Sequence, residues 1–438
     1  MRNLLLYLIL FIFPGTIFSQ SLFEKAVNAP DSTKSKNYQI NGYIRGVYYT
    51  GGDLNKDDIE TNSAYGELDL KLRAKKSNWG DAYTNFRYRY GWEYNNDISD
   101  FIMREAYVKI MLGKFEYLIG KKIMSWGRAD GFNPTDNLTP KNFIVRSPDD
   151  DDRRLGNFIF QTKYGISDYK LEFNWVPVYR ASVMPYDLVE LPENVSLEEA
   201  TYPNSNLKNS AWAARINIEK SKFDGSVSYF EGYDPNPGIN LLDIQYSPES
   251  MLIKVNPEAY RMRIFGADFS TAINALGIRG EFAWRNPLGN YENNLYIPNP
   301  DLQYVIGIDR GFGKFSILLQ YIGRHVLNFN NDVDPQLIIQ NEISAINKKF
   351  NYQLHKFSHS VSLRPSLNLL HETLNIDAFV LYNYSTKELL IRPKLTYEVG
   401  DAVKLSFGIE HYYGGNNTLF KMLGDNLNGF FFELRAAF

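Results

Sequence analysis

The segment Ala64-Tyr-Gly-Glu-Leu-Asp-Leu-Lys-Leu-Arg-Ala74 carries the clearest structural signal in the chain. Its apolar side chains, among them Leu68, Leu70 and Leu72, fall on one parity, and charged side chains occupy the positions between them. Successive side chains of a β-strand point to opposite faces of the sheet. The segment therefore predicts a strand with one apolar face and one charged face.

The same two-residue period recurs along the whole chain. Phe86, Tyr88 and Tyr90 alternate with polar residues in one segment, and Ile278 and Phe282 do so in another. We predict about 18 strands, with 16 as the alternative count. The predicted strands lie near 38–50, 63–75, 81–93, 102–112, 114–123, 154–165, 168–179, 210–220, 222–233, 259–272, 275–286, 302–312, 314–327, 356–370, 372–385, 388–399, 402–413 and 429–438.

The connections between these strands alternate in length. Short connections include 76–80, 166–167 and 273–274, and long ones include 94–101 and 124–153, with only 386–387 breaking the rule. Short periplasmic turns and long extracellular loops are typical of outer-membrane barrels. The sequence therefore predicts an all-β fold, a transmembrane antiparallel β-barrel.

Composition supports this fold class and excludes several functions. The 438 residues include 31 Tyr, 29 Phe, 6 Trp and no Cys, and the formal net charge is −3. The mean hydropathy of −0.34 does not fit a helical membrane protein, but it fits strands whose apolar and polar faces cancel. The absence of cysteine excludes a disulfide scaffold, a thiol nucleophile and Cys-ligated metal. The balanced charge argues against nucleic-acid binding.

Three segments make up the predicted organisation. Residues 1–19 read as a secretory signal peptide, because Arg2 precedes a short apolar run and cleavage is expected near Ser19/Gln20. Residues 20–37 are expected to form a flexible periplasmic lead, and 38–438 the barrel. The last strand ends on Phe438, which resembles the signature that the outer-membrane assembly machinery reads. The predicted location is the bacterial outer membrane.

Charged side chains on the parity opposite the apolar one are expected to line the barrel lumen. The predicted lumen cations are Arg73, Arg87, Arg89, Arg261, Arg263, Arg279, Arg285, Arg364, Arg392 and Lys394. An excess of cations on this parity would favour anions, because a low-dielectric wall concentrates the field. The alternative is that arginine–carboxylate pairs only hold neighbouring strands together.

The connection 124–153 is expected to fold into the barrel and narrow it. Its predicted constriction residues are Trp126, Arg128, Asp130, Phe132, Asn133 and Asp136. The alternative is an extracellular cap. The run Asp149-Asp-Asp-Asp152 is interpreted as a solvated acidic loop, with Ca²⁺ binding or a divalent bridge to lipopolysaccharide as the other readings.

The stretch Gly120-Lys-Lys-Ile-Met-Ser-Trp-Gly-Arg-Ala-Asp-Gly-Phe-Asn-Pro-Thr-Asp-Asn-Leu-Thr-Pro140 resembles a "GRQ…WG…D…NP.D…NP" motif. This motif belongs to a porin-like family of outer-membrane barrels of undefined role, some of which are thought to accompany RND-type exporters. The chain has Lys121-Lys122 where the family commonly has Arg-Gln. The architecture also has a weaker similarity to barrels that export anionic polysaccharide. The resemblance implies no catalytic residue.

These observations predict a porin, channel or export-pathway barrel that passes small or anionic solutes through a basic lumen. The alternative is a non-conducting barrel whose extracellular loops bind another protein. No enzyme activity or cofactor is expected. No metal site is expected either, because His355 and His359 lie at the start of a strand, where their spacing does not place both side chains around one metal ion. Expected partners are membrane lipid and lipopolysaccharide, the assembly machinery, and an exporter or a surface lipoprotein. A short amphipathic helix is expected over 335–350.

Overall fold

The computed structural model describes residues 37–52, 59–76, 79–94, 96–188, 192–248, 251–330 and 336–438. The predicted signal peptide and, apart from Asn37, the predicted periplasmic lead lie outside the described residues. Within the described residues, no helix is both long enough and apolar enough to cross a bilayer.

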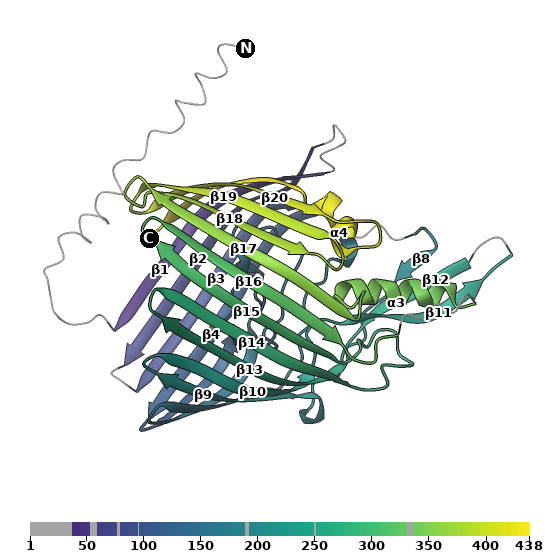
Figure 1. Cartoon of the computed structure of the whole chain (residues 1–438), viewed down its shortest axis with the longest axis horizontal. Coiled ribbons are helices and arrows are strands. Elements are labelled where there is room, and N and C mark those ends of the chain that lie inside the picture. Colours follow the sequence, from purple (N-terminus) through teal and green to yellow (C-terminus); the bar gives the residue numbers. More distant parts are fainter. Residues whose placement is uncertain are drawn as a thin grey trace, which may run out of the picture.

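The described part of the chain forms one closed sheet of 18 strands (Figure 1). Every neighbouring pair in this sheet is antiparallel, and β1 pairs with both β2 and β21, which closes the barrel. The strands are β1 (Tyr38–Gly51), β2 (Glu60–Lys76), β3 (Gly80–Glu93), β4 (Asn96–Leu112), β5 (Phe115–Lys122), β6 (Asn157–Ile166), β7 (Tyr169–Val176), β9 (Ala211–Lys220), β10 (Phe223–Tyr233), β13 (Arg261–Ile273), β14 (Leu276–Leu288), β15 (Asp301–Phe312), β16 (Phe315–Val326), β17 (Phe357–Leu369), β18 (Leu374–Asn383), β19 (Glu388–Gly400), β20 (Val403–Tyr413) and β21 (Gly429–Ala437). The predicted count of 18 strands is confirmed.

Successive residues of each strand point alternately outward and inward, so the barrel wall has two faces. On β2, Leu68 is exposed on the outer face, whereas Glu67 and Asp69 are buried inside. Aromatic rings cover much of the outer face, and Phe160, Trp175 and Trp212 stack in succession, with ring centroids 4.9 and 5.6 Å apart. An apolar, aromatic outer band with a polar interior is the pattern of a barrel that faces lipid.

One predicted loop is a strand. Residues 94–101 were expected to form a long connection, but β4 begins at Asn96 and pairs with β3 as far as Glu93. The polar residues at the start of β4 resemble a loop in composition, yet their backbone continues the ladder. A register shift opposite Asn85 and Phe86 leaves Arg104 as the extra residue of a bulge.

The long connections gather at one end of the barrel, here called the loop end, and the tight turns at the other, the turn end (Figure 1). At the loop end, β8 (Val195–Leu197), β11 (Gly238–Tyr246) and β12 (Met251–Glu258) form a small second sheet. The helix α3 (Ile338–Phe350) packs on it through Ile343 and confirms the predicted amphipathic helix. The sequence patterns missed this sheet and the helix α4 (Leu419–Leu427). The described residues also contain three short 3-10 turns, η1 (Asp150–Arg153), η2 (Tyr186–Leu188) and η3 (Leu207–Asn209).

Candidate functional site

The connection between β5 and β6 enters the barrel and packs against its inner wall. Trp126 is only 3% exposed and belongs to a buried cluster with Leu118 of β5, Ile159 of β6, and Met262 and Ile264 of β13. The indole nitrogen of Trp126 donates to the Glu172 carboxylate of β7 at 3.2 Å. An aromatic side chain of this size buries a large apolar area, so it fixes the start of the loop inside the lumen.

A carboxylate on β14 holds the backbone of the next residues. Glu281 accepts hydrogen bonds from the backbone N–H groups of Arg128 and Ala129 and from the Thr135 hydroxyl. Gly127 makes this approach possible, because its φ is +95° and a Cβ atom there would lie 2.4 Å from a Glu281 oxygen. The loop therefore docks on β14 through a site that only glycine fits.

The acidic run Asp149–Asp152 lies inside the barrel, where Asp152 is buried and Asp151 stays open to the lumen. Its carboxylates face different partners: Asp149 lies 3.1 Å from Arg435, and Asp150 lies 2.9 Å from Arg392. Asp152 lies 2.6 Å from Arg45 and 2.6 Å from another arginine, Arg87. The interpretation as a solvated acidic loop is wrong for Asp152, which is buried between arginines of the barrel wall, whereas Asp151 is exposed. Because the four carboxylates have different arginine partners, they do not form a shared binding site for a metal ion among the described residues.

Burial and charge act in opposite directions on the carboxylates of this turn. Burial raises the pKa of Asp150, but Arg392 and Arg153 outweigh it and hold that pKa at about 2. Burial also raises the pKa of Asp152, yet the nearby arginines hold it well below its usual range. Both groups are therefore ionised at neutral pH and act as permanent counter-charges.

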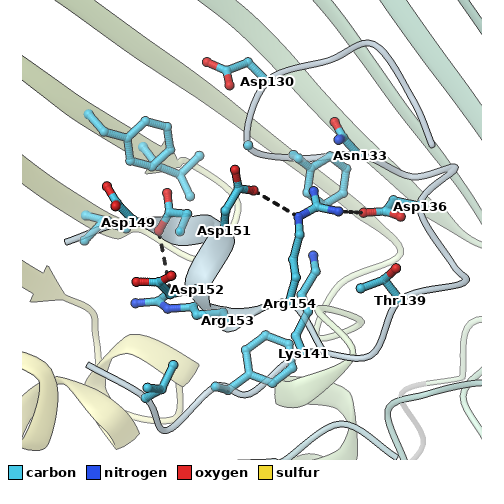
Figure 2. A pocket seen from close by; sticks show the side chains of 18 of the residues that line it. Asp130, Asn133, Asp136, Thr139, Lys141, Asp149, Asp151, Asp152, Arg153 and Arg154 are labelled. Carbon is cyan, nitrogen blue, oxygen red and sulfur yellow. Dashed lines mark hydrogen bonds and ion pairs between the residues drawn. The ribbon is translucent and has the colours of Figure 1, made fainter. Parts of the chain in front are cut away.

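A second ion pair braces the loop against itself. Arg154 donates to Asp136 at 2.8 Å and lies 3.2 Å from Asp151 (Figure 2). Asp136 is buried, and the burial raises its pKa despite Arg154 and Lys141. Across the lumen, Asp130 pairs with Arg364 of β17 at 2.8 Å. The loop thus contacts strands around most of the barrel circumference.

One cavity of about 1340 Å³ surrounds the inserted loop. Its lining extends from Lys71 and Asn375, near the turn end, to Leu390 and Tyr412, near the loop end. Phe132 and Asn133 also line it, together with the other predicted constriction residues except the buried Trp126. The inserted loop therefore occupies part of the lumen, and this cavity lies beside it.

Most of the predicted lumen cations take part in ion pairs. Arg89 pairs with Glu67 at 2.7 Å, and Arg87 joins the same carboxylate cluster. The remaining inward-facing pairs are Arg73–Asp81, Arg279–Asp309, Arg285–Asp234, Arg364–Asp130, Arg392–Glu410 and Lys394–Asp377. The pairs support the reading that these residues brace the wall, and several of the same residues also line the cavity. That their charge favours anions stays a prediction.

Two of the predicted lumen cations are on the outer wall. Arg261 and Arg263 share the parity of Phe265, which is exposed and stacks on the outward-facing Trp284 at 5.6 Å. The prediction that Arg261 and Arg263 line the lumen is wrong. The inward-facing residues at the start of this strand are Met262 and Ile264, which are buried in the same apolar cluster as Trp126 of the inserted loop.

A closed antiparallel barrel with an aromatic outer band and a polar interior entered by a loop defines a class. The chain has the fold of a transmembrane antiparallel β-barrel.

Solved structures share this fold at low sequence identity. They include Acinetobacter baumannii OccAB3, with 11% identity, a TM-score of 0.55 and coverage of 92% of this chain and 99% of that one. Pseudomonas aeruginosa OccK2 (OpdF) in complex with glucuronate has 10% identity, a TM-score of 0.54, and 92% and 97% coverage. Pseudomonas aeruginosa OpdK with vanillate has 9% identity, a TM-score of 0.53, and 92% and 98% coverage. No family model and no curated protein matches the sequence.

Proposed function

We propose that the chain is a passive diffusion channel for small anionic solutes, in particular monocarboxylates. The observation that carries this proposal is the charge of the cavity lining. Among the described residues, 14 lysines and arginines line the cavity against eight aspartates. A cavity with this excess of cations attracts anions, because the surrounding wall screens the field poorly.

Partly exposed cations near the turn end of the cavity supply the contacts. Arg364 and Arg435 keep 36% and 31% of their side chains exposed although each has one aspartate partner. Lys394 is 4.0 Å from Asp377, the longest distance among these pairs, and Lys71 has no ion-pair partner among the described residues. Arginine offers five donors, so a guanidinium that binds one aspartate can still receive a solute carboxylate.

The solved structures with the same fold are compatible with this proposal. Glucuronate and vanillate, which accompany OccK2 and OpdK, are both small carboxylates. Because the shared fold alone links those proteins to this chain, the direct support comes from its own lining residues. An exporter or a surface-lipoprotein partner remains a prediction.

Solute influx into proteoliposomes tests the proposal. The wild-type chain should admit glucuronate faster than glucose, which has a similar size and no charge. Arg364→Gln combined with Lys394→Gln should reduce the ratio of the two rates, whereas Arg263→Gln on the outer wall should leave it unchanged. Equal rates for the two solutes would refute anion preference. A folded barrel without influx of either solute would favour the non-conducting alternative.

A further inference from the structure

Two cations meet on the outer wall at the loop end of β5. Lys121 has the same parity as Tyr117 and Ile119, which are both exposed on the outer face. Arg180 belongs to the connection that follows β7. Both side chains converge on Gly156: Arg180 donates to its carbonyl at 2.7 Å, and a Cβ atom there would lie 3.2 Å from the Lys121 Cγ.

Neither cation has a carboxylate partner among the described residues. The Lys121 ammonium donates to the Met103 carbonyl at 2.5 Å, and the Arg180 guanidinium donates to the Gly156 carbonyl. Both side chains are partly buried, and burial lowers the pKa of Arg180. Each of these two neighbouring positive charges is met by one backbone carbonyl, so each keeps further N–H donors for an anion.

The surroundings define the kind of anion. Lys121 pairs in register with Phe158, which is exposed and packs edge-on against Phe160 at 5.5 Å. This contact begins the outer aromatic row that continues through Trp175. Aromatic side chains mark the membrane interface, so the two cations lie at headgroup level just beyond it. A ligand at this position has an anionic headgroup above the aromatic row and apolar chains beside it.

We propose that Lys121 and Arg180 bind a phosphate group of lipopolysaccharide in the leaflet at the loop end. Arginine and lysine are the usual phosphate ligands in proteins, and charge-assisted hydrogen bonds to phosphate are short and strong. The site lies outside the lumen, so it is independent of the proposed solute passage.

Native mass spectrometry of the full chain in detergent tests the assignment. The titrants are bis-phosphorylated lipid A, dephosphorylated lipid A, phosphatidylglycerol and inorganic phosphate. Lys121→Gln combined with Arg180→Gln should weaken binding of bis-phosphorylated lipid A about 10-fold or more, because two charge-assisted contacts are lost. The matched control is Lys220→Gln combined with Arg310→Gln, which removes two cations at the turn end and should leave the affinity unchanged.

Each other outcome would overturn the assignment. Equal affinity of the double variant and the wild type would show that the two cations do not bind the lipid. Equal affinity for dephosphorylated lipid A would show that the acyl chains alone drive binding. Equal affinity for phosphatidylglycerol, or displacement of lipid A by millimolar inorganic phosphate, would replace lipopolysaccharide with a general phosphate ligand. A heat-induced gel shift would verify that every variant is a folded barrel.

Discussion

Replacing Asp152 with asparagine should release the acidic turn, which is the run Asp149–Asp152, from the barrel wall. The Asp152 carboxylate lies 2.6 Å from Arg45 and 2.6 Å from Arg87, and only 5% of its side chain is exposed. Breaking a buried ion pair by removing one partner costs about 3–5 kcal/mol. Because Glu67 remains to pair with both arginines, we expect the lower end of that range, about 3 kcal/mol. This corresponds to a roughly 100-fold larger population of released loop.

Limited trypsin digestion measures this population. Arg153 and Arg154 follow the acidic turn directly, and both lie in the cavity lining, so cleavage there requires the loop to leave the lumen. When release is fast compared with cleavage, the cleavage rate follows the population of the released state. Mass spectrometry identifies the fragments that end at these two arginines. In Asp152→Asn they should appear about 100-fold faster than in the wild type.

The neighbouring residue Asp151 provides a matched control. Its side chain is 90% exposed, and within the described residues its one ion pair is with Arg154 at 3.2 Å. Exposed pairs of this kind contribute about 0–1 kcal/mol. Asp151→Asn removes the same charge one position away and should change the cleavage rate less than tenfold. Equal rates for the two variants would refute the idea that Asp152 anchors the turn.

Three further predictions concern the same loop. Gly127→Ala should displace the loop from Glu281, because a Cβ atom cannot fit 2.4 Å from the carboxylate. Single-channel conductance should therefore rise, and an unchanged conductance would count against this contact. Trp126→Ala should weaken the binding of the loop to the barrel wall by about 3–5 kcal/mol and raise single-channel conductance. A conductance equal to that of the wild type would contradict the role of Trp126 as an anchor. The Asp150 pKa of about 2 lies below its usual value, so the Arg392 contact should stabilise the loop fully above about pH 4 and be lost as pH falls through 2. Conductance recorded between pH 5 and 2 checks this, and a transition near pH 4 would show that the pair does not hold.

The strands could be predicted from sequence because the barrel wall separates lipid from a polar interior. In β2, Leu68 faces outward and Glu67 inward, and this contrast appears directly as a two-residue period. Where the interior is not polar, the same reasoning fails. Met262 and Ile264 belong to a buried apolar cluster that also contains Trp126 of the inserted loop. The inward side of β13 therefore resembles a lipid-facing side in sequence, which leads to the wrong prediction that Arg263 lines the lumen.

The insertion of the loop was predictable from its length and aromatic content, but its anchors were not. The acidic run resembles a solvated loop because sequence neighbours alone give no information about Arg45, Arg392 and Arg435. These arginines come from strands far away in the chain, and only barrel closure brings them to the acidic turn. A hint was available, since the predicted lumen carried more cations than acids and the loop carried an acidic excess.

The small sheet at the loop end could not be predicted for a related reason. Its strands β8, β11 and β12 come from separate connections, and β8 has only three residues. Their apolar residues, such as Ile239 of β11, cluster with Ile343 of α3 about 100 residues further along the chain and produce no local period. Short strands that pair only through such contacts leave little signal in a sequence window.

Planar-bilayer recording of the wild-type chain under a salt gradient tests the central claim most directly. The claim is that the inserted loop leaves a basic passage beside it, lined by cations such as Arg364 and Lys394. We predict stable single-channel steps with a reversal potential of the sign that anion selectivity gives. A folded barrel that shows no steps, or one whose reversal potential indicates cation selectivity, would contradict the account.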